Sequence, residues 1–117
     1  MRRSDYRIAF AVYQNMIHGR WETDMIVSFR GKVVEQVAKG VAPKGFPAGL
    51  VASAERKLRA IDFAQDLRDL RSPPGNRLEA LRGSRAGQHS IRINDQWRIC
   101  FRWTDAGAED VEIVDYH

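Results

Sequence analysis

The sequence predicts an α+β domain in which two helices from the N-terminal half pack on one face of a curved antiparallel β-sheet. Three observations support this fold class. Apolar residues recur at helical spacing between positions 33 and 70, and they alternate at the two-residue period of strands beyond position 90. Turn-forming residues separate the alternating stretches, as in hairpins. The chain has 117 residues, of which 44% are hydrophobic, so it is long enough for one domain with one core.

The first 24 residues are expected to be an N-terminal extension, and residues 25–117 to form the folded domain. Within the extension, residues 5–17 have apolar positions at helical spacing, which predicts a short amphipathic helix. Residues 25–29 then alternate as a first strand would. Because that strand opens on Met25, a second candidate start residue, we expect the extension to be dispensable.

Two apolar stripes predict the helices of the domain. The first stripe consists of Val33, Val34, Val37 and Ala38, and Gly40 ends it as a C-terminal glycine typically does. The second helix begins at Pro47, and its apolar face consists of Leu50, Val51, Ala54, Leu58 and Ile61. The periodicity continues, slightly shifted, through Phe63, Leu67 and Leu70, so the helix is expected to reach the Pro-Pro-Gly segment that ends the pattern.

Three strands follow with a two-residue period. One turns Ile91 and Ile93 toward the core, and the next does the same with Trp97, Ile99, Phe101 and Trp103. Asn94 and Asp95 supply a tight turn between them, and a turn at 104–108 leads to a last strand around 111–114. The opposite face of the sheet is therefore free for function. We expect it to carry Arg92, Arg98, Cys100 and Arg102.

Arginine is concentrated in the last third of the chain. The net charge is +4, and positions 76–103 hold six arginines against two acids, Glu79 and Asp95. Guanidinium groups bind phosphate oxygens through charge-assisted, often bidentate hydrogen bonds, so this segment predicts a polyanion-binding face. A solvated polar surface is the alternative for any single arginine. The residues expected to bind a polyanion in this way are Arg77, Arg85, Arg92 and Arg102.

Several classes of protein do not fit the sequence. No stretch approaches the roughly 20 apolar residues that span a bilayer, and the N-terminus does not fit a signal peptide. Cys100 has no second cysteine with which to form an internal disulfide, which favours a reducing cytoplasm. The three histidines and one cysteine lack the spacing of metal ligands, and no glycine-rich phosphate loop occurs, so neither a metal nor another cofactor is expected.

The sequence ends on a carboxylate, a phenol and an imidazole, those of Asp115, Tyr116 and His117. Histidine titrates near neutral pH, and proton transfer by a positioned side chain contributes about 10²- to 10⁴-fold to a rate. These three residues are therefore candidates for acid and base catalysis. A frayed terminus is the alternative.

Taken together, residues 25–117 resemble the HigB-type toxins of the RelE superfamily, the killer half of a bacterial type II toxin–antitoxin pair. The resemblance rests on the motifs at 25–29, 76–83, 87–94, 96–101 and 115–117. It implies a cytoplasmic endoribonuclease that cleaves messenger RNA in the ribosomal A site. It also implies a helix-turn-helix antitoxin of the HigA type as partner, and leaves open whether toxin and antitoxin assemble as a heterotetramer.

The resemblance also implies site residues. The arginine of the family's Trp-Arg-Ile motif is Arg98, and the family's C-terminal acid, phenol and imidazole fall on residues 115–117. Some members have a histidine in place of Glu79 and a lysine in place of Arg82, which leaves the general base open. Arginine is too basic to accept a proton, so Arg82 is expected to supply charge only. Glu79 is either a proton acceptor or an ion-pair partner. The expected catalytic set is thus Arg98, His117, Tyr116, Asp115, Arg82 and Glu79.

Two functions from other classes remain as alternatives. One is a ParE-like toxin that inhibits DNA gyrase by binding it, without a catalytic site. The Trp-Arg-Ile motif and the terminal Asp-Tyr-His motif argue against this alternative. The other is a non-catalytic RNA-binding module whose basic face holds backbone phosphates only.

Overall fold

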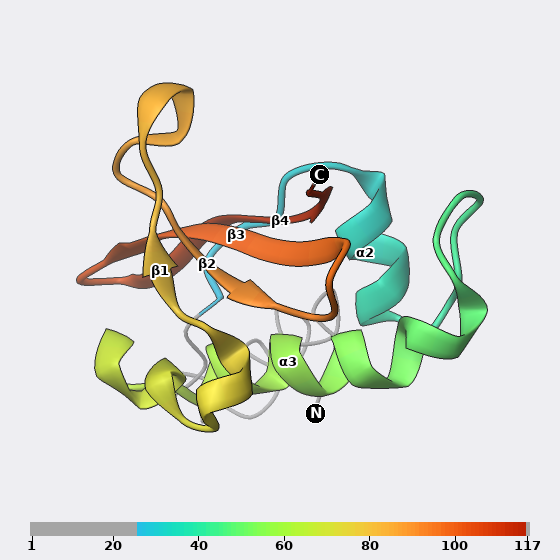
Figure 1. The fold of residues 1–117 in the computed structure, drawn as a ribbon, viewed down its shortest axis with the longest axis horizontal. Coiled ribbons are helices and arrows are strands. Elements are labelled where there is room, and N and C mark those ends of the chain that lie inside the picture. Colours follow the sequence, from blue (N-terminus) through green and yellow to red (C-terminus); the bar gives the residue numbers. More distant parts are fainter. Residues whose placement is uncertain (1–25, 117) are drawn as a thin grey trace, which may run out of the picture.

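The computed structural model describes residues 26–116 of the chain (Figure 1). The predicted helix at 5–17 and the rest of the extension lie outside the described residues. The described part contains the helices α2 (Lys32–Ala38) and α3 (Val51–Phe63), followed by the strands β1 (Glu79–Ala80), β2 (His89–Arg92), β3 (Trp97–Thr104) and β4 (Gly107–Asp115). Single 3₁₀ turns complete it: η2 (Ala48–Leu50), η3 (Leu67–Arg71), η4 (Pro74–Asn76) and η5 (Gly83–Arg85). The predicted α+β class is confirmed.

The four strands form one antiparallel sheet in chain order, β1-β2-β3-β4. The β3–β4 register shifts by one residue, because Cys100 faces Glu112 whereas Arg102 faces Glu109. The extra residue lies on β4, where Asp110 has a positive φ of 52°. This geometry is that of a β-bulge, which bends a strand and increases its local twist.

The predicted first strand at 25–29 is replaced by two isolated parallel bridges to β4. Ile26 pairs with Ala108, and Phe29 pairs with Val111. At the bulge between these two bridges, the N–H of Asp110 donates to the hydroxyl of Ser28 (2.9 Å) rather than to a backbone carbonyl. A regular ladder is therefore interrupted, and the segment follows the edge of the sheet without forming a strand.

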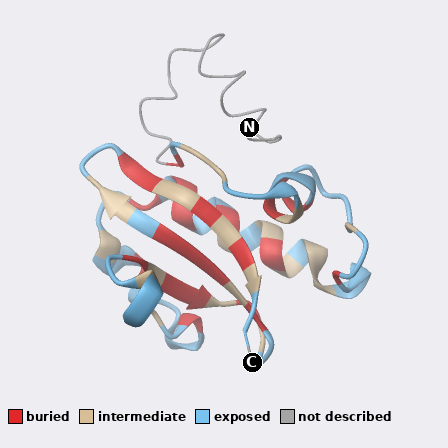
Figure 2. Ribbon diagram, turned by 90° about the horizontal axis from the view of Figure 1, so that it is seen from above, coloured by how far each residue is buried: buried red, intermediate tan, exposed pale blue. Residues whose placement is uncertain are grey.

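The core lies between the two helices and one face of the sheet (Figure 2). The predicted apolar faces are confirmed at its centre, where the most deeply buried side chains belong to Val34, Val37, Ile61, Ile91, Ile99, Phe101 and Val111. The ring of Trp97 packs edge-on against Phe46, with ring centroids 4.9 Å apart. In the part of the chain that the structure describes, no helix is long and apolar enough to cross a membrane.

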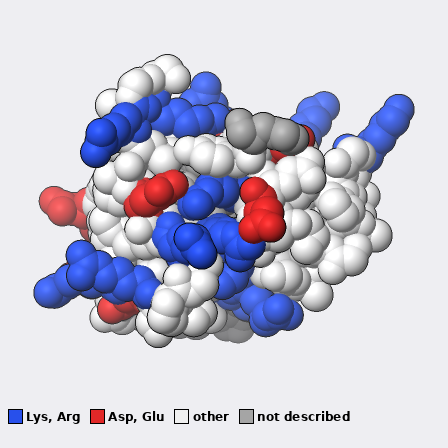
Figure 3. Space-filling view, viewed as in Figure 1, with Lys and Arg blue, Asp and Glu red and all other residues white. Residues whose placement is uncertain are grey.

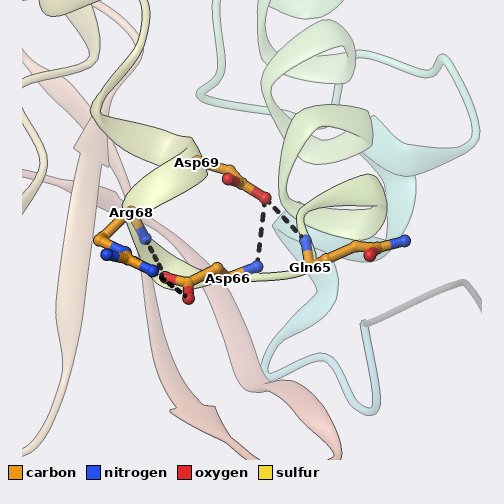
Figure 4. A network of polar contacts seen from close by, with 4 residues as sticks. All are labelled: Gln65, Asp66, Arg68 and Asp69. Atoms are coloured by element: carbon orange, nitrogen blue, oxygen red, sulfur yellow. Dashed lines mark hydrogen bonds and ion pairs between the residues drawn. The ribbon is translucent and has the colours of Figure 1, made fainter.

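The second helix is shorter than predicted. It ends at Phe63, and a separate 3₁₀ turn begins after Asp66. Asp66 Oδ1 accepts a hydrogen bond from the N–H of Arg68 (2.8 Å), while Asp69 Oδ2 accepts one from the N–H of Asp66 (3.2 Å) (Figure 4). This capping box starts a new helical turn. Because Leu70 of that turn is also buried in the core, the apolar periodicity continues across a break in the backbone.

Candidate functional site

Four residues form a row across the face of the sheet that is opposite the core. Glu79 of β1 is the register partner of Ser90, Ser90 of Cys100, and Cys100 of Glu112 on β4. Register partners on neighbouring strands project to the same face. Ser90 and Cys100 are fully buried even though this face is turned away from the core. They form the floor of the candidate site, with charged residues around them.

Arg98 lies beside this floor and is held from several sides. Its Nη1 donates to Ser90 Oγ at 2.9 Å and to the carbonyl oxygen of Arg77 at 3.5 Å. Glu79 Oε1 lies 3.5 Å from the same nitrogen, and the ring centroid of Tyr116 lies 5.2 Å from Arg98 Cζ. The side chain of Arg98 is only 13% exposed. A charge that is fixed and partly removed from water in this way is preorganised to stabilise negative charge.

A second arginine on the same face is held by two polar partners. Arg85 Nη1 donates to Gln88 Oε1 at 3.0 Å and to Glu112 Oε1 at 3.2 Å. The charges of Arg85 and Glu112, with those of Arg98 and Glu79, also act on the thiol of Cys100. Burial, with the two carboxylates, outweighs the two arginines and raises the pKa of Cys100, so the thiol stays protonated and unreactive at neutral pH.

Two further arginines of the predicted RNA-binding set have carboxylate partners that are exposed to solvent. Arg92 is the register partner of Arg98 and pairs with Asp95, whose side chain is 98% exposed. The hydrogen bond and the charge of Arg92 lower the pKa of Asp95. Arg102 Nε lies 4.0 Å from Asp110 Oδ2 at the bulge. Both carboxylates are open to solvent, so an incoming phosphate has little to displace.

The remaining predicted residues lie at the ends of elements. Arg77 and Arg82 are exposed, and Arg82 precedes η5 in the loop that projects beyond β1 and β2 (Figure 1). Asp115 is the register partner of Trp97, on the side of the sheet opposite Arg98, and its Oδ2 accepts a hydrogen bond from Gln96 Nε2 (3.2 Å). The structure thus places Tyr116, but not Asp115, against Arg98. His117 lies outside the described residues.

The sheet face opposite the core carries more acidic side chains than the composition of residues 76–103 indicates. Figure 3 shows Lys and Arg side chains gathered over the middle of the sheet, with acidic side chains on either side of them. Sequence reasoning did not include Ser90, Gln88 and Glu112 among the site residues. Alternation along the last strand gives a signal for Glu112, because Val111 and Ile113 on either side of it face the core.

Among residues 26–116, no three His, Cys, Asp or Glu side chains form a group that could hold a metal ion.

Comparison with known proteins shows the family to which the chain belongs. A family model described as the RelE-like toxin of the type II toxin-antitoxin system HigB matches residues 27–117. Toxin HigB-1 of Vibrio cholerae serotype O1 is 40% identical over 85 residues, which cover 72% of this chain and 90% of that protein. Endoribonuclease HigB of Proteus vulgaris is 32% identical over 93 residues, which cover 80% of this chain and all of that protein. The chain belongs to the HigB-like family of RelE-like toxins of type II toxin–antitoxin systems.

Proposed function

We propose that this toxin is a ribosome-dependent endoribonuclease that stops translation by cleaving messenger RNA in the ribosomal A site. The observation that carries the proposal is the guanidinium group of Arg98, which is 13% exposed and fixed by Ser90, Glu79 and Tyr116 on the sheet face opposite the core. Burying a charge is costly unless the charge is paired and hydrogen-bonded, and Glu79 and Ser90 meet both conditions for Arg98. The name of the Proteus vulgaris relative supports the same activity.

The proposed reaction is an attack of an RNA 2′-hydroxyl on the adjacent phosphorus. A bond forms between that oxygen and phosphorus while the bond to the 5′-oxygen breaks, giving a 2′,3′-cyclic phosphate and a 5′-hydroxyl. Arg98 stabilises the additional negative charge on the phosphorane, and Arg82 adds a second positive charge. One proton leaves the nucleophile and one reaches the leaving oxygen. We assign these transfers to His117 and Tyr116 ahead of Asp115, with Glu79 as a further candidate for the base.

The outer arginines bind the RNA backbone in this proposal. Arg77 is exposed, and the carboxylate partners of Arg92 and Arg102 are open to solvent. Contacts of this type position the backbone without reading sequence, and they weaken as salt rises.

A single 2′-deoxynucleotide tests the proposed chemistry. We expect the full chain to cleave an all-ribose messenger in programmed ribosomes, and not the messenger that carries one 2′-deoxynucleotide on the 5′ side of the scissile bond. The deoxy messenger lacks the nucleophile. The measurement is the amount of fragment with a 5′-hydroxyl end. Cleavage of both messengers at the same rate would exclude attack by the 2′-hydroxyl.

Membership in a type II family implies that the toxin has an antitoxin partner. We propose a helix-turn-helix protein of the HigA type, bound in a heterotetramer in the cytoplasm. The family model begins at residue 27, which supports the division of the chain into an extension at 1–24 and a toxin domain at 25–117. Sequencing the adjacent reading frame tests the identity of the partner. Measuring the molecular mass of the purified complex tests the stoichiometry.

A further inference from the structure

The ion pair between Arg85 and Glu112 differs from every other ion pair in residues 26–116. Its side chains are 30% and 28% exposed, and no other pair has both partners below one third. Gln88, which is 6% exposed, adds a third contact through its Oε1. This network joins β4 to the β1–β2 loop.

A phosphate is a poor ligand for this network. The carboxylate of Glu112 cancels the charge of Arg85 and repels an approaching anion. A neutral group with both hydrogen-bond donors and acceptors fits better, because the guanidinium group offers N–H donors beside an acceptor oxygen, Glu112 Oε2. Two apolar side chains lie next to the network: Leu81, whose N–H donates to the carbonyl oxygen of Gln88, and Cys100, the register partner of Glu112. A nucleobase has a flat apolar face and a polar edge with donors and acceptors.

The position of the network also fits a base. Glu112 is the register partner of Cys100, which is the partner of Ser90, the residue that anchors Arg98. Neighbouring strands are about 4.8 Å apart, so Glu112 lies about 10 Å from Ser90 across the sheet. A nucleotide with its phosphate near Arg98 has its base within reach of this distance.

We propose that Arg85, Gln88 and Glu112 form a subsite that recognises a guanine base of the bound RNA. Guanine offers a carbonyl acceptor, O6, next to two donors, N1–H and the exocyclic amino group. Arg85 then donates to O6 while Glu112 accepts from both donors. Adenine and cytosine each give Glu112 a single amino group, and uracil gives it one ring N–H. The inference rests on the proposed function, because it assumes that RNA binds this face.

The first test measures binding, which does not depend on cleavage. Short RNA oligonucleotides that contain guanine, inosine or adenine at one position are titrated against the full chain by fluorescence anisotropy. We expect the full chain to bind the guanine RNA about 10- to 100-fold more tightly than the adenine RNA, a typical discrimination for a bidentate contact. Inosine lacks the exocyclic amino group and is expected to lie between them.

Glu112→Gln is expected to reduce this preference to less than about threefold, because an amide has one acceptor oxygen and an amino donor where a carboxylate has two acceptor oxygens. Glu109→Gln, on the same strand, is the matched control and should keep it. If Glu112→Gln lowers the melting temperature, the double variant Arg85→Glu with Glu112→Arg retains an ion pair while exchanging donor and acceptor, and it should also lose the preference.

Two results would overturn the subsite. One is equal affinity of the wild-type chain for guanine and adenine RNA. The other is a Glu112→Gln variant that keeps the wild-type preference or binds every RNA more tightly with a steeper salt dependence, which would make Glu112 only a neutralising partner of Arg85. A chain that prefers guanine in binding but cleaves no messenger in ribosomes would contradict the proposed function and leave the subsite standing.

Discussion

Replacing Arg98 with alanine is expected to lower the rate of messenger cleavage by at least about 10³-fold and to abolish growth arrest in bacteria. Loss of one preorganised donor to a developing oxyanion typically costs about 10²- to 10³-fold, and Arg98 also contributes a full positive charge. The fold should survive, because Arg98 lies on the face opposite the core. Its loss leaves Ser90 Oγ without a donor, which costs about 1 kcal/mol. Cleavage rate and melting temperature are measured on the same sample.

Arg59→Ala is the matched control for this substitution. Arg59 lies on α3, is 55% exposed, and pairs with Glu55 at 3.6 Å. The Arg59→Ala substitution removes the same positive charge from the chain at a distance from the site. It should therefore leave the rate of cleavage unchanged. The growth assay is run on the full chain and on a chain that begins at Met25, which should be equally toxic if the extension is dispensable. A folded Arg98→Ala variant that still arrests growth would remove Arg98 from the mechanism.

Deletion of His117 alone is expected to reduce cleavage by about 10²- to 10⁴-fold, the usual contribution of a positioned acid or base. A terminal residue adds little to a core, so the free energy of unfolding should change by less than about 0.5 kcal/mol. Single-turnover cleavage and urea unfolding give the two quantities. Parallel losses in stability and activity would instead assign His117 a structural role.

Tyr116→Phe is the companion variant at the same terminus. It keeps the ring whose centroid lies 5.2 Å from Arg98 Cζ and removes only the hydroxyl. If Tyr116 supplies a proton, this variant should lose activity to a degree comparable with the deletion. Full activity in Tyr116→Phe would limit the residue to holding Arg98 or stacking on a base.

Much of the fold follows from local periodicity. The faces of β2 and β3 were predictable because alternation in a half-buried strand fixes which side chains meet the core, as for Ile91 and Ile99. The end of α3 was not predictable from periodicity. Leu70 resumes the apolar spacing after a break in the helix, and that break depends on the carboxylates of Asp66 and Asp69. The path of the segment 26–29 along the sheet edge depends on the bulge at 110, which lies more than 80 residues away in sequence.

Only the part of the candidate site that lies on a single strand was predictable from the sequence. Alternation and the Trp-Arg-Ile motif place Arg98 on the free face, and the structure agrees. The partners of the arginines come from other elements: Ser90 is eight residues from Arg98 in sequence, and Glu112 is 27 residues from Arg85. Such contacts depend on strand register, which a single sequence does not specify. For this reason the count of six arginines against two acids overstated how basic the face is.

We propose that the ribosome completes a site that is insufficient by itself. Neither Glu79 nor the arginines provide a strong general base, and flexible messenger RNA is seldom in line for attack. Alignment of reacting groups can supply about 7–11 kcal/mol of a barrier. The decisive measurement compares cleavage of one messenger, naked and bound in programmed ribosomes, at matched salt. We predict cleavage at least about 10²-fold faster in ribosomes, confined to the A-site codon. Equal rates on naked and ribosome-bound messenger would contradict the account and make the protein a free ribonuclease.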